Sequence, residues 1–353
     1  MSKEKLRTWL PVLCLMVLTG IVAAFSPLNP WGDSEFTKVQ QTMLDSSQRV
    51  RDGYLAYVEI DSNSGPVLNE ILALGILASS HFKTPYIINF IIEIVIIFAS
   101  TLFVYKTIHL MASEWTSVVM TAVLFLWYVR MFTVAGAEEY VFPLLAASTY
   151  TLVAQIKKGY MGYMTYDMAV CMALVFFLQS NYVIIWIGYI IILCASMKVK
   201  ELPKKQWKRL WMSILEGIGT VTIPMAIYLW YFDNIKEFFD SVVLFRLEDI
   251  KNSTASHSIN AGEMLGNSMI VLLAVYVVLM LYKGIKGKMK SENQVWLVIM
   301  ALILITTSFQ SDHLESFQLL AKVIYIMPLA MVAECIDELI NLNKKRKHVN
   351  KYL

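Results

Sequence analysis

The chain has 353 residues, of which 57% are hydrophobic and only 16% are charged, with a formal net charge of +3. Soluble domains carry about a quarter of their residues as charged side chains, so this composition excludes a large soluble domain and indicates many membrane-spanning helices. It gives no support to nucleic-acid binding, because the basic runs lie in loops between apolar segments. We expect an all-α, polytopic membrane protein with a single transmembrane domain over residues 1–353.

The first apolar segment, residues 9–27, follows the basic start MSKEKLR. Together with the small residues Ala23 and Ala24, this start also fits a cleavable signal peptide. Because many further apolar segments follow, we favour an uncleaved first helix.

Apolar segments of about the length that a helix needs to cross a bilayer recur along the whole chain. We expect about ten spans, at residues 9–27, 86–105, 115–132, 139–156, 162–179, 182–197, 210–231, 264–283, 294–310 and 318–336. Residues 66–80 form a shorter apolar segment that contains Asn69 and Glu70, and this segment is marginal as a span.

The placement of Lys and Arg indicates whether residues 66–80 cross the membrane, because basic residues collect in cytoplasmic loops. If residues 66–80 do not cross, most of the 30 Lys and Arg residues fall on the cytoplasmic side. If they cross, every later loop changes sides and the rule is broken. We therefore expect a re-entrant or interfacial helix on the outer face, with both termini cytoplasmic. Residues 28–85 and 232–263 are then the two long extracytoplasmic loops.

Four sequence motifs follow one another in an order that resembles a known family. The first apolar segment runs into the acidic pair Asp33-Ser34-Glu35, and its loop ends in DGYLAYVEIDSNSGPVLNEILALG. The next outer loop reads AGAEEYVFPLLA, and a late outer loop with a histidine precedes a proline-containing span, SDHLESFQLLAKVIYIMP. In this order the motifs resemble those of the class C glycosyltransferases (GT-C fold), multi-span enzymes that take a sugar from a polyprenyl-phosphate carrier. The segment LVFFLQSNYVIIW is also similar to a family stretch, with Gln179 where the family usually has Lys.

The resemblance implies a catalytic site on the extracytoplasmic face, with Asp33 as the base. Partial burial beside the membrane raises the pKa of a carboxyl group towards neutrality, which suits a general base. We assign Glu35 a supporting role in substrate binding. The alternative is that both acids only stop the first helix from sliding into lipid.

Glu138 and Glu139 are candidates for substrate recognition in the same cleft. Carboxylates at a helix N-terminus are also favourable in their own right, which is the alternative explanation.

The leaving phosphate of the carrier needs a cation, and Arg246 and Lys251 in the second long loop are the candidates that the resemblance favours. Arginine can bind phosphate oxygens with two parallel hydrogen bonds. The alternative is a solvated amphipathic helix, since FFDSVVLFRLEDI has an apolar stripe at helical spacing. His313, Gln179 and Asn181 are further candidate substrate contacts. Each is also explained as a polar residue of an outer loop or turn.

Two acidic residues, Glu93 and Glu216, fall inside predicted spans. A carboxyl group is costly there unless it has a partner or faces a cavity, so we expect one or the other at each position. Neither residue belongs to a motif of the family.

We expect no bound metal and no cofactor, although Asp33 with Glu138 or Glu139 could chelate one. The four cysteines lie in apolar segments at no metal-ligand spacing, so we expect free thiols. The partners implied are a polyprenyl-phosphate-linked sugar donor, a glycan or lipid-linked acceptor, the lipid bilayer and a membrane partner subunit.

The function we expect is transfer of a monosaccharide to a cell-surface glycan or lipid-linked acceptor. The alternatives are a non-enzymatic flippase for lipid-linked sugars, a subunit of a polysaccharide assembly or export complex, and a polysaccharide polymerase. A transporter typically shows broken helices and inverted repeats, and we find no repeat. A polymerase needs Arg and His in its large outer loops, whereas the outer loops here are rich in acid.

Overall fold

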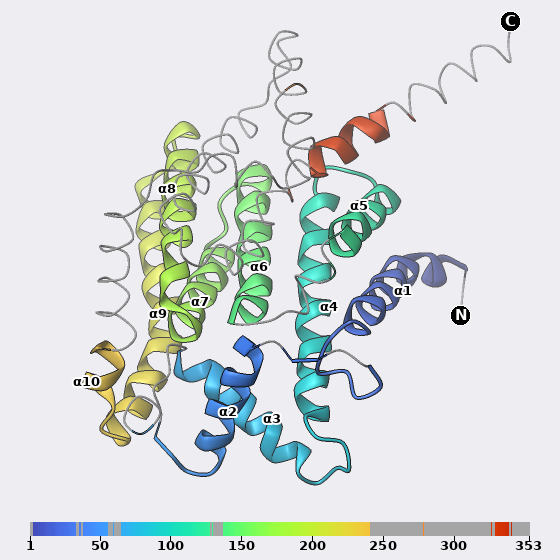
Figure 1. Ribbon diagram of the computed structural model, residues 1–353. Coiled ribbons are helices and arrows are strands. Elements are labelled where there is room, and N and C mark those ends of the chain that lie inside the picture. Colours follow the sequence, from blue (N-terminus) through green and yellow to red (C-terminus); the bar gives the residue numbers. More distant parts are fainter. Residues whose placement is uncertain are drawn as a thin grey trace, which may run out of the picture.

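The computed structural model describes residues 3–32, 35–36, 38–55, 59, 65–127, 129, 137–240, 278, 326, 329–338 and 340. In this part of the chain every regular element is a helix, so the expected all-α class is confirmed there. The helices are α1 (Lys3–Ala23), α2 (Lys38–Arg51), α3 (Pro66–Ser79), α4 (Ile87–His109), α5 (Glu114–Trp127), α6 (Ala137–Lys158), α7 (Gly162–Leu178), the 3₁₀ helix η2 (Ser180–Val183), α8 (Ile184–Val199), α9 (Lys204–Tyr231) and α10 (Ile235–Phe238) (Figure 1).

Two of these helices, α4 and α9, are long and apolar enough to cross a membrane. Five further apolar segments in the described residues are helical but shorter than 18 residues; they are Trp9–Ala23, Pro66–Ser79, Glu114–Trp127, Gly162–Leu178 and Ile185–Val199. The predicted spans 264–283 and 294–310 lie outside the described residues, apart from Val278, and 318–336 is described only in part. The expectation of about ten spans therefore stays a prediction.

Helix α6 forms the centre of the bundle, with α4 on one side and α7 on the other (Figure 1). Almost all of its residues between Glu139 and Ile156 are buried, as expected for a helix surrounded by others. Polar links fix α8 against it, since the Trp186 indole donates to Ser148 Oγ at 2.9 Å and the Tyr189 and Thr149 hydroxyls lie 2.8 Å apart.

The outward faces of the surrounding helices are apolar. The exposed side chains include Leu13, Val17 and Ile21 in α1, Ile91 and Val95 in α4, Val119 and Val123 in α5, Ile187 and Ile191 in α8, and Leu215, Ile223 and Ile227 in α9. Most recur at intervals of four residues, so each helix shows one continuous apolar stripe. A soluble monomer rarely exposes so much contiguous apolar surface, whereas lipid is a favourable neighbour for it.

Helix α3 lies across one end of the bundle (Figure 1). At its start, the Gly65 N–H donates to the Leu178 carbonyl at the end of α7 (2.9 Å), and the Tyr228 hydroxyl near the end of α9 donates to Glu70. At its far end, the Ser79 hydroxyl oxygen accepts from the Ile88 N–H at the start of α4 (3.0 Å). We call this the α3 end of the bundle.

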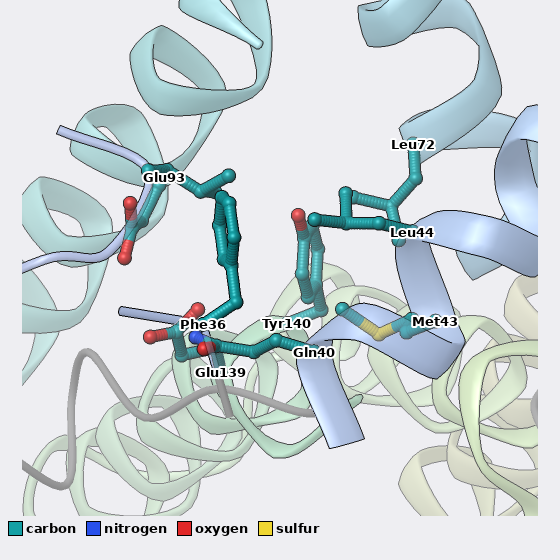
Figure 2. A pocket seen from close by; sticks show the side chains of 9 residues that line it. Phe36, Gln40, Met43, Leu44, Leu72, Glu93, Glu139 and Tyr140 are labelled. Atoms are coloured by element: carbon teal, nitrogen blue, oxygen red, sulfur yellow. The ribbon is translucent and has the colours of Figure 1, made fainter. Parts of the chain in front are cut away.

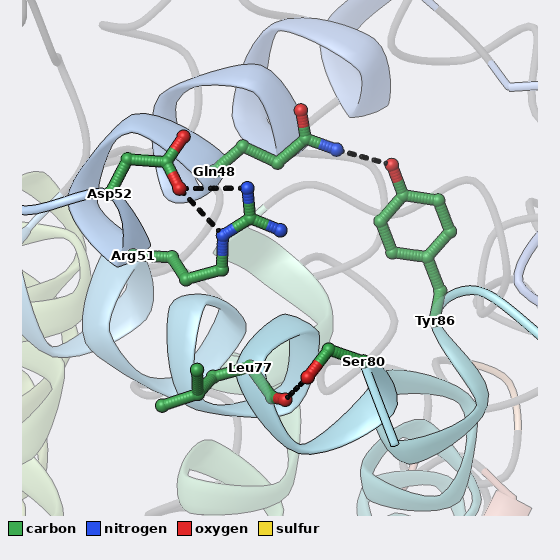
Figure 3. A network of polar contacts seen from close by, with 6 residues as sticks. All are labelled: Gln48, Arg51, Asp52, Leu77, Ser80 and Tyr86. Atoms are coloured by element: carbon green, nitrogen blue, oxygen red, sulfur yellow. Dashed lines mark hydrogen bonds and ion pairs between the residues drawn. The ribbon is translucent and has the colours of Figure 1, made fainter. Parts of the chain in front are cut away.

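Helix α2 packs on α3 and is fixed to the start of α4 (Figure 3). The Gln48 amide donates to the Tyr86 hydroxyl at 2.7 Å, directly before α4 begins. Arg51 and Asp52 form an ion pair at 2.8 Å at the end of α2, where the two side chains are 31% and 51% exposed and the pair contributes little to stability.

The opposite end of the bundle is basic and also closed by side chains. Lys157 at the end of α6 donates to the Leu110 carbonyl just after α4 (2.9 Å). The C-terminal helical segment, residues 329–338, is fixed there by Asp337, whose carboxylate accepts from the Ser113 and Thr116 hydroxyls at 2.9 and 2.6 Å. Partial burial disfavours the charged form of Asp337, but these hydrogen bonds and the one from the Ser113 N–H outweigh it and lower its pKa.

Replacing Gly65 by Ala tests how α3 is held. An added Cβ would lie 1.9 Å from the Phe177 carbonyl oxygen, so the start of α3 must move away from α7. We expect Gly65→Ala to lower the free energy of unfolding by about 1–3 kcal/mol, measured by thermal unfolding of the purified protein. Gly20→Ala is the matched control: nothing lies within 4 Å of its Cβ position, so stability should be unchanged or higher. Equal melting temperatures for the two variants would contradict this packing.

Candidate functional site

The predicted site residues are only partly within the described chain. Asp33, Arg246, Lys251 and His313 lie outside the described residues, as does the side chain of Asn181. The other candidates, Glu35, Glu138, Glu139 and Gln179, are described, and all of them lie at the α3 end.

A small cavity at the α3 end is formed where α2, α3, α4, α6 and the chain after α1 meet (Figure 2). It is lined by Leu28, Phe36, Gln40, Met43, Leu44, Leu72, Glu93, Glu139 and Tyr140. The cavity has a volume of about 10 Å³. A cavity of this size has room for one water-sized group and not for a sugar ring.

Glu93 lies two turns inside α4 and is 2% exposed. The hydroxyl of Ser26, in the turn after α1, donates to Glu93 Oε2 at 2.5 Å, and Ser26 Oγ accepts from the Leu28 N–H at 3.0 Å. As expected for an acid within a span, Glu93 has a partner and also faces a cavity. Glu216 differs, because it lies on the exposed face of α9.

Glu139 reaches the same cavity from the start of α6 and is 4% exposed. Its carboxyl group lies within hydrogen-bonding reach of Glu93. Because an ionised carboxylate can only accept, a hydrogen bond between two carboxyl groups requires one proton between them. No Lys or Arg is among the described residues that line the cavity.

Glu138, the neighbouring residue, is not among the residues that line the cavity and bonds to the turn after α7. Its Oε1 accepts a hydrogen bond from the Tyr182 hydroxyl at 2.7 Å. Tyr182 belongs to η2, the turn that follows Gln179 at the end of α7, and the Gln179 N–H closes that helix on the Val175 carbonyl at 2.7 Å. The structure thus brings Glu138 beside the turn that contains Gln179 and Asn181.

The loop between α1 and α2 contains Asp33, which lies outside the described residues. Two aromatic residues of this loop, one before and one after Asp33, pack against the start of α4. Trp31 packs edge-to-face on Phe90, with ring centroids 6.3 Å apart. Phe36 packs edge-to-face on Tyr86 at 5.9 Å and also lines the cavity. Glu35, between them, is exposed.

Sequence reasoning missed two polar residues that line the cavity, Gln40 and Tyr140, and a third, Ser26, that donates to Glu93. The signal for Tyr140 was present, since it follows Glu139 directly in the AEEYVFP motif. Ser26 and Gln40 carry no sequence signal, because their role depends on which helices meet. Among the described residues, no group of three His, Cys, Asp or Glu side chains could hold a metal ion.

Removing the hydroxyl of Ser26 tests the link between α1 and α4. Ser26→Ala leaves the buried Glu93 carboxyl group without its donor, so we expect the free energy of unfolding to fall by about 1–3 kcal/mol. Ser46→Ala on α2 is the control, because that hydroxyl bonds only to its own helix at Thr42, and we expect a change within about 0.5 kcal/mol. Chemical unfolding of both variants in detergent gives the comparison. A Ser26→Ala protein as stable as the control would show that the bond is unimportant.

No protein-family model matches the chain, and no curated protein or solved structure matches it either. Functional assignment therefore rests on the motifs and on the geometry of the α3 end.

Proposed function

We propose that this chain is a GT-C-type glycosyltransferase that works at the α3 end of its bundle. It transfers a monosaccharide from a polyprenyl-phosphate carrier to a cell-surface glycan or lipid-linked acceptor. The observation that carries the proposal is the gathering of acidic groups at one place. Glu93 and Glu139 face a shared cavity, and the loop that contains Asp33 packs beside it.

The distribution of aromatic residues supports a membrane around the bundle. Trp211 and Trp230 on α9 are both exposed and lie 19 positions apart, which is about 29 Å along a helix. The hydrocarbon core is about 30 Å thick, and exposed tryptophans gather at its two boundaries. Trp115 and Trp127 are likewise exposed at the two ends of α5.

The charge distribution supports an extracytoplasmic α3 end. Basic residues occupy the opposite end, where α6 ends at Lys157 and Lys158, α8 ends near Lys198, and α9 begins at Lys204. Lys and Arg mark the cytoplasmic side of a membrane protein. The acidic groups at the α3 end then face the outside of the cell.

The geometry of α3 agrees with a helix that lies along the membrane surface. It has 14 residues, so it is about 21 Å long and too short to cross the hydrocarbon core. Its two ends are bonded to helix ends that lie on the same side of the bundle. The first loop and the start of α6 therefore face one compartment.

In the proposed reaction, the Asp33 carboxylate takes the proton of an acceptor hydroxyl as its oxygen attacks the anomeric carbon of the sugar. The bond from that carbon to the phosphate oxygen breaks, and its electron pair leaves with the polyprenyl phosphate. Arg246 and Lys251 stabilise the charge on the leaving phosphate. Glu35, Glu138, Gln179, Asn181 and His313 supply hydrogen bonds to the substrates.

The continuity of the long helices favours an enzyme over a flippase. Transporters bind substrate at helices that are broken near the membrane midplane. Here α6 and α9 run unbroken past Pro143 and Pro224. The cavity also lies at the end of the bundle and not at its middle.

Replacing Asp33 by Asn tests the base directly. The change keeps the shape of the side chain but removes its ability to take a proton. We expect transfer from polyprenyl-phosphate sugars, measured in proteoliposomes, to fall by about 10²–10⁴-fold with unchanged melting temperature.

Asp52→Asn is the matched control, since Asp52 is an exposed acid of the same loop whose partner is Arg51. We expect it to keep full activity. An Asp33→Asn enzyme as active as the Asp52→Asn enzyme would remove Asp33 from the mechanism.

A further inference from the structure

The hydroxyl of Tyr140 is an unmatched polar group within the cavity. Tyr140 is 6% exposed, yet its hydroxyl makes no hydrogen bond within the described part of the chain. The other deeply buried tyrosines do have partners, since Tyr182 donates to Glu138 and Tyr189 bonds Thr149. A hydroxyl that lines a cavity and is bonded to no described residue can donate to a group that enters the cavity.

The carboxyl groups of Glu93 and Glu139 supply acceptors in the same cavity. Ser26 binds only one oxygen of Glu93, Oε2. A ligand atom in the cavity therefore meets a phenol that can donate and carboxyl oxygens that can accept. A hydroxyl group does both at once, whereas a metal ion cannot accept from Tyr140 and an apolar group can satisfy neither.

The size and charge of the cavity limit the ligand further. The cavity, about 10 Å³, has the size of one hydroxyl group. Two acidic side chains without a described basic neighbour in the lining disfavour a phosphate or carboxylate. Apolar walls from Phe36, Leu44 and Leu72 suit the C–H face of a ring to which that hydroxyl is attached.

We propose that this cavity is a subsite for one hydroxyl group of a sugar, with Tyr140 as its donor and the Glu93–Glu139 pair as its acceptor. The assignment rests on the proposed glycosyl transfer and adds to it two specificity-determining residues, Tyr140 and Glu93, that the sequence analysis did not assign to the site. The sugar belongs either to the donor or to the acceptor. Phe36, three residues after Asp33, brings the subsite next to the loop of the expected base.

Tyr140→Phe removes only the hydroxyl and is the first test. Since that hydroxyl has no described protein partner, we expect an unchanged melting temperature. We expect kcat/KM for sugar transfer to fall about 3–10-fold, the range of one hydrogen bond. Tyr189→Phe is the matched control, because it breaks the bond to Thr149 far from the site; it should lower the melting temperature and leave kcat/KM unchanged.

Deoxy analogues identify the hydroxyl and its source. A set of donors and a set of acceptors, each lacking one hydroxyl, is assayed with the wild-type and Tyr140→Phe proteins. For one analogue the two proteins should have equal kcat/KM, because the group that Tyr140 binds is already missing. Whether that analogue is a donor or an acceptor tells which sugar enters the cavity.

Four outcomes overturn the subsite. If the wild type transfers sugar and Tyr140→Phe keeps its kcat/KM, the subsite is wrong while the transferase proposal stands. The same holds if Tyr140→Phe loses activity equally with every analogue, or if its melting temperature falls as in Tyr189→Phe. If the wild type transfers no sugar from any polyprenyl-phosphate donor, the proposed function itself fails and the subsite with it.

Discussion

The crosswise docking of α3 is the constraint on which the rest of the structure depends. The backbone at Gly65 approaches the end of α7 so closely that no side chain fits between them, and the Tyr228–Glu70 bond joins α3 to α9. Further along α3, the Asn89 amide of α4 donates to the Leu72 carbonyl at 3.1 Å. These contacts gather the ends of three helices at one surface. Without them, the first loop and the start of α6 would not lie at the same surface of the bundle.

Burying two carboxyl groups at that surface lowers the stability of the fold, and such a loss is typical of a functional site. Glu93 and Glu139 lie among apolar side chains, where an unpaired charge is strongly unfavourable. A Leu or Met pair would fill the same space with less penalty, as replacements of buried ion pairs show elsewhere. Local choices that oppose stability are expected at functional sites. The hydrogen bond from Ser26 and the neighbouring carboxyl group reduce the cost.

The sequence was enough to locate most described helices but not the cavity. Hydropathy placed residues 66–80 and 86–105 close to Pro66–Ser79 and Ile87–His109, because apolar segments bounded by Gly, Pro or charge have clear ends. It missed the first two turns of α9, which begins at Lys204 and not at 210, because a basic amphipathic start is helical without being hydrophobic. Ser26 could not be predicted, since its role arises only when α1 and α4 meet, whereas Tyr140 follows Glu139 in the AEEYVFP motif.

The central claim is that the α3 end faces the outside of the cell and the basic end faces the cytoplasm. Single cysteines at Asp52 and Lys204, both exposed positions at opposite ends of the bundle, test it in a variant without Cys14, Cys171, Cys194 and Cys335. A membrane-impermeant maleimide applied to intact cells should label Asp52→Cys, and Lys204→Cys should react only after the membrane is permeabilised. Labelling of Lys204→Cys in intact cells would place the acidic cavity in the cytoplasm and contradict the account.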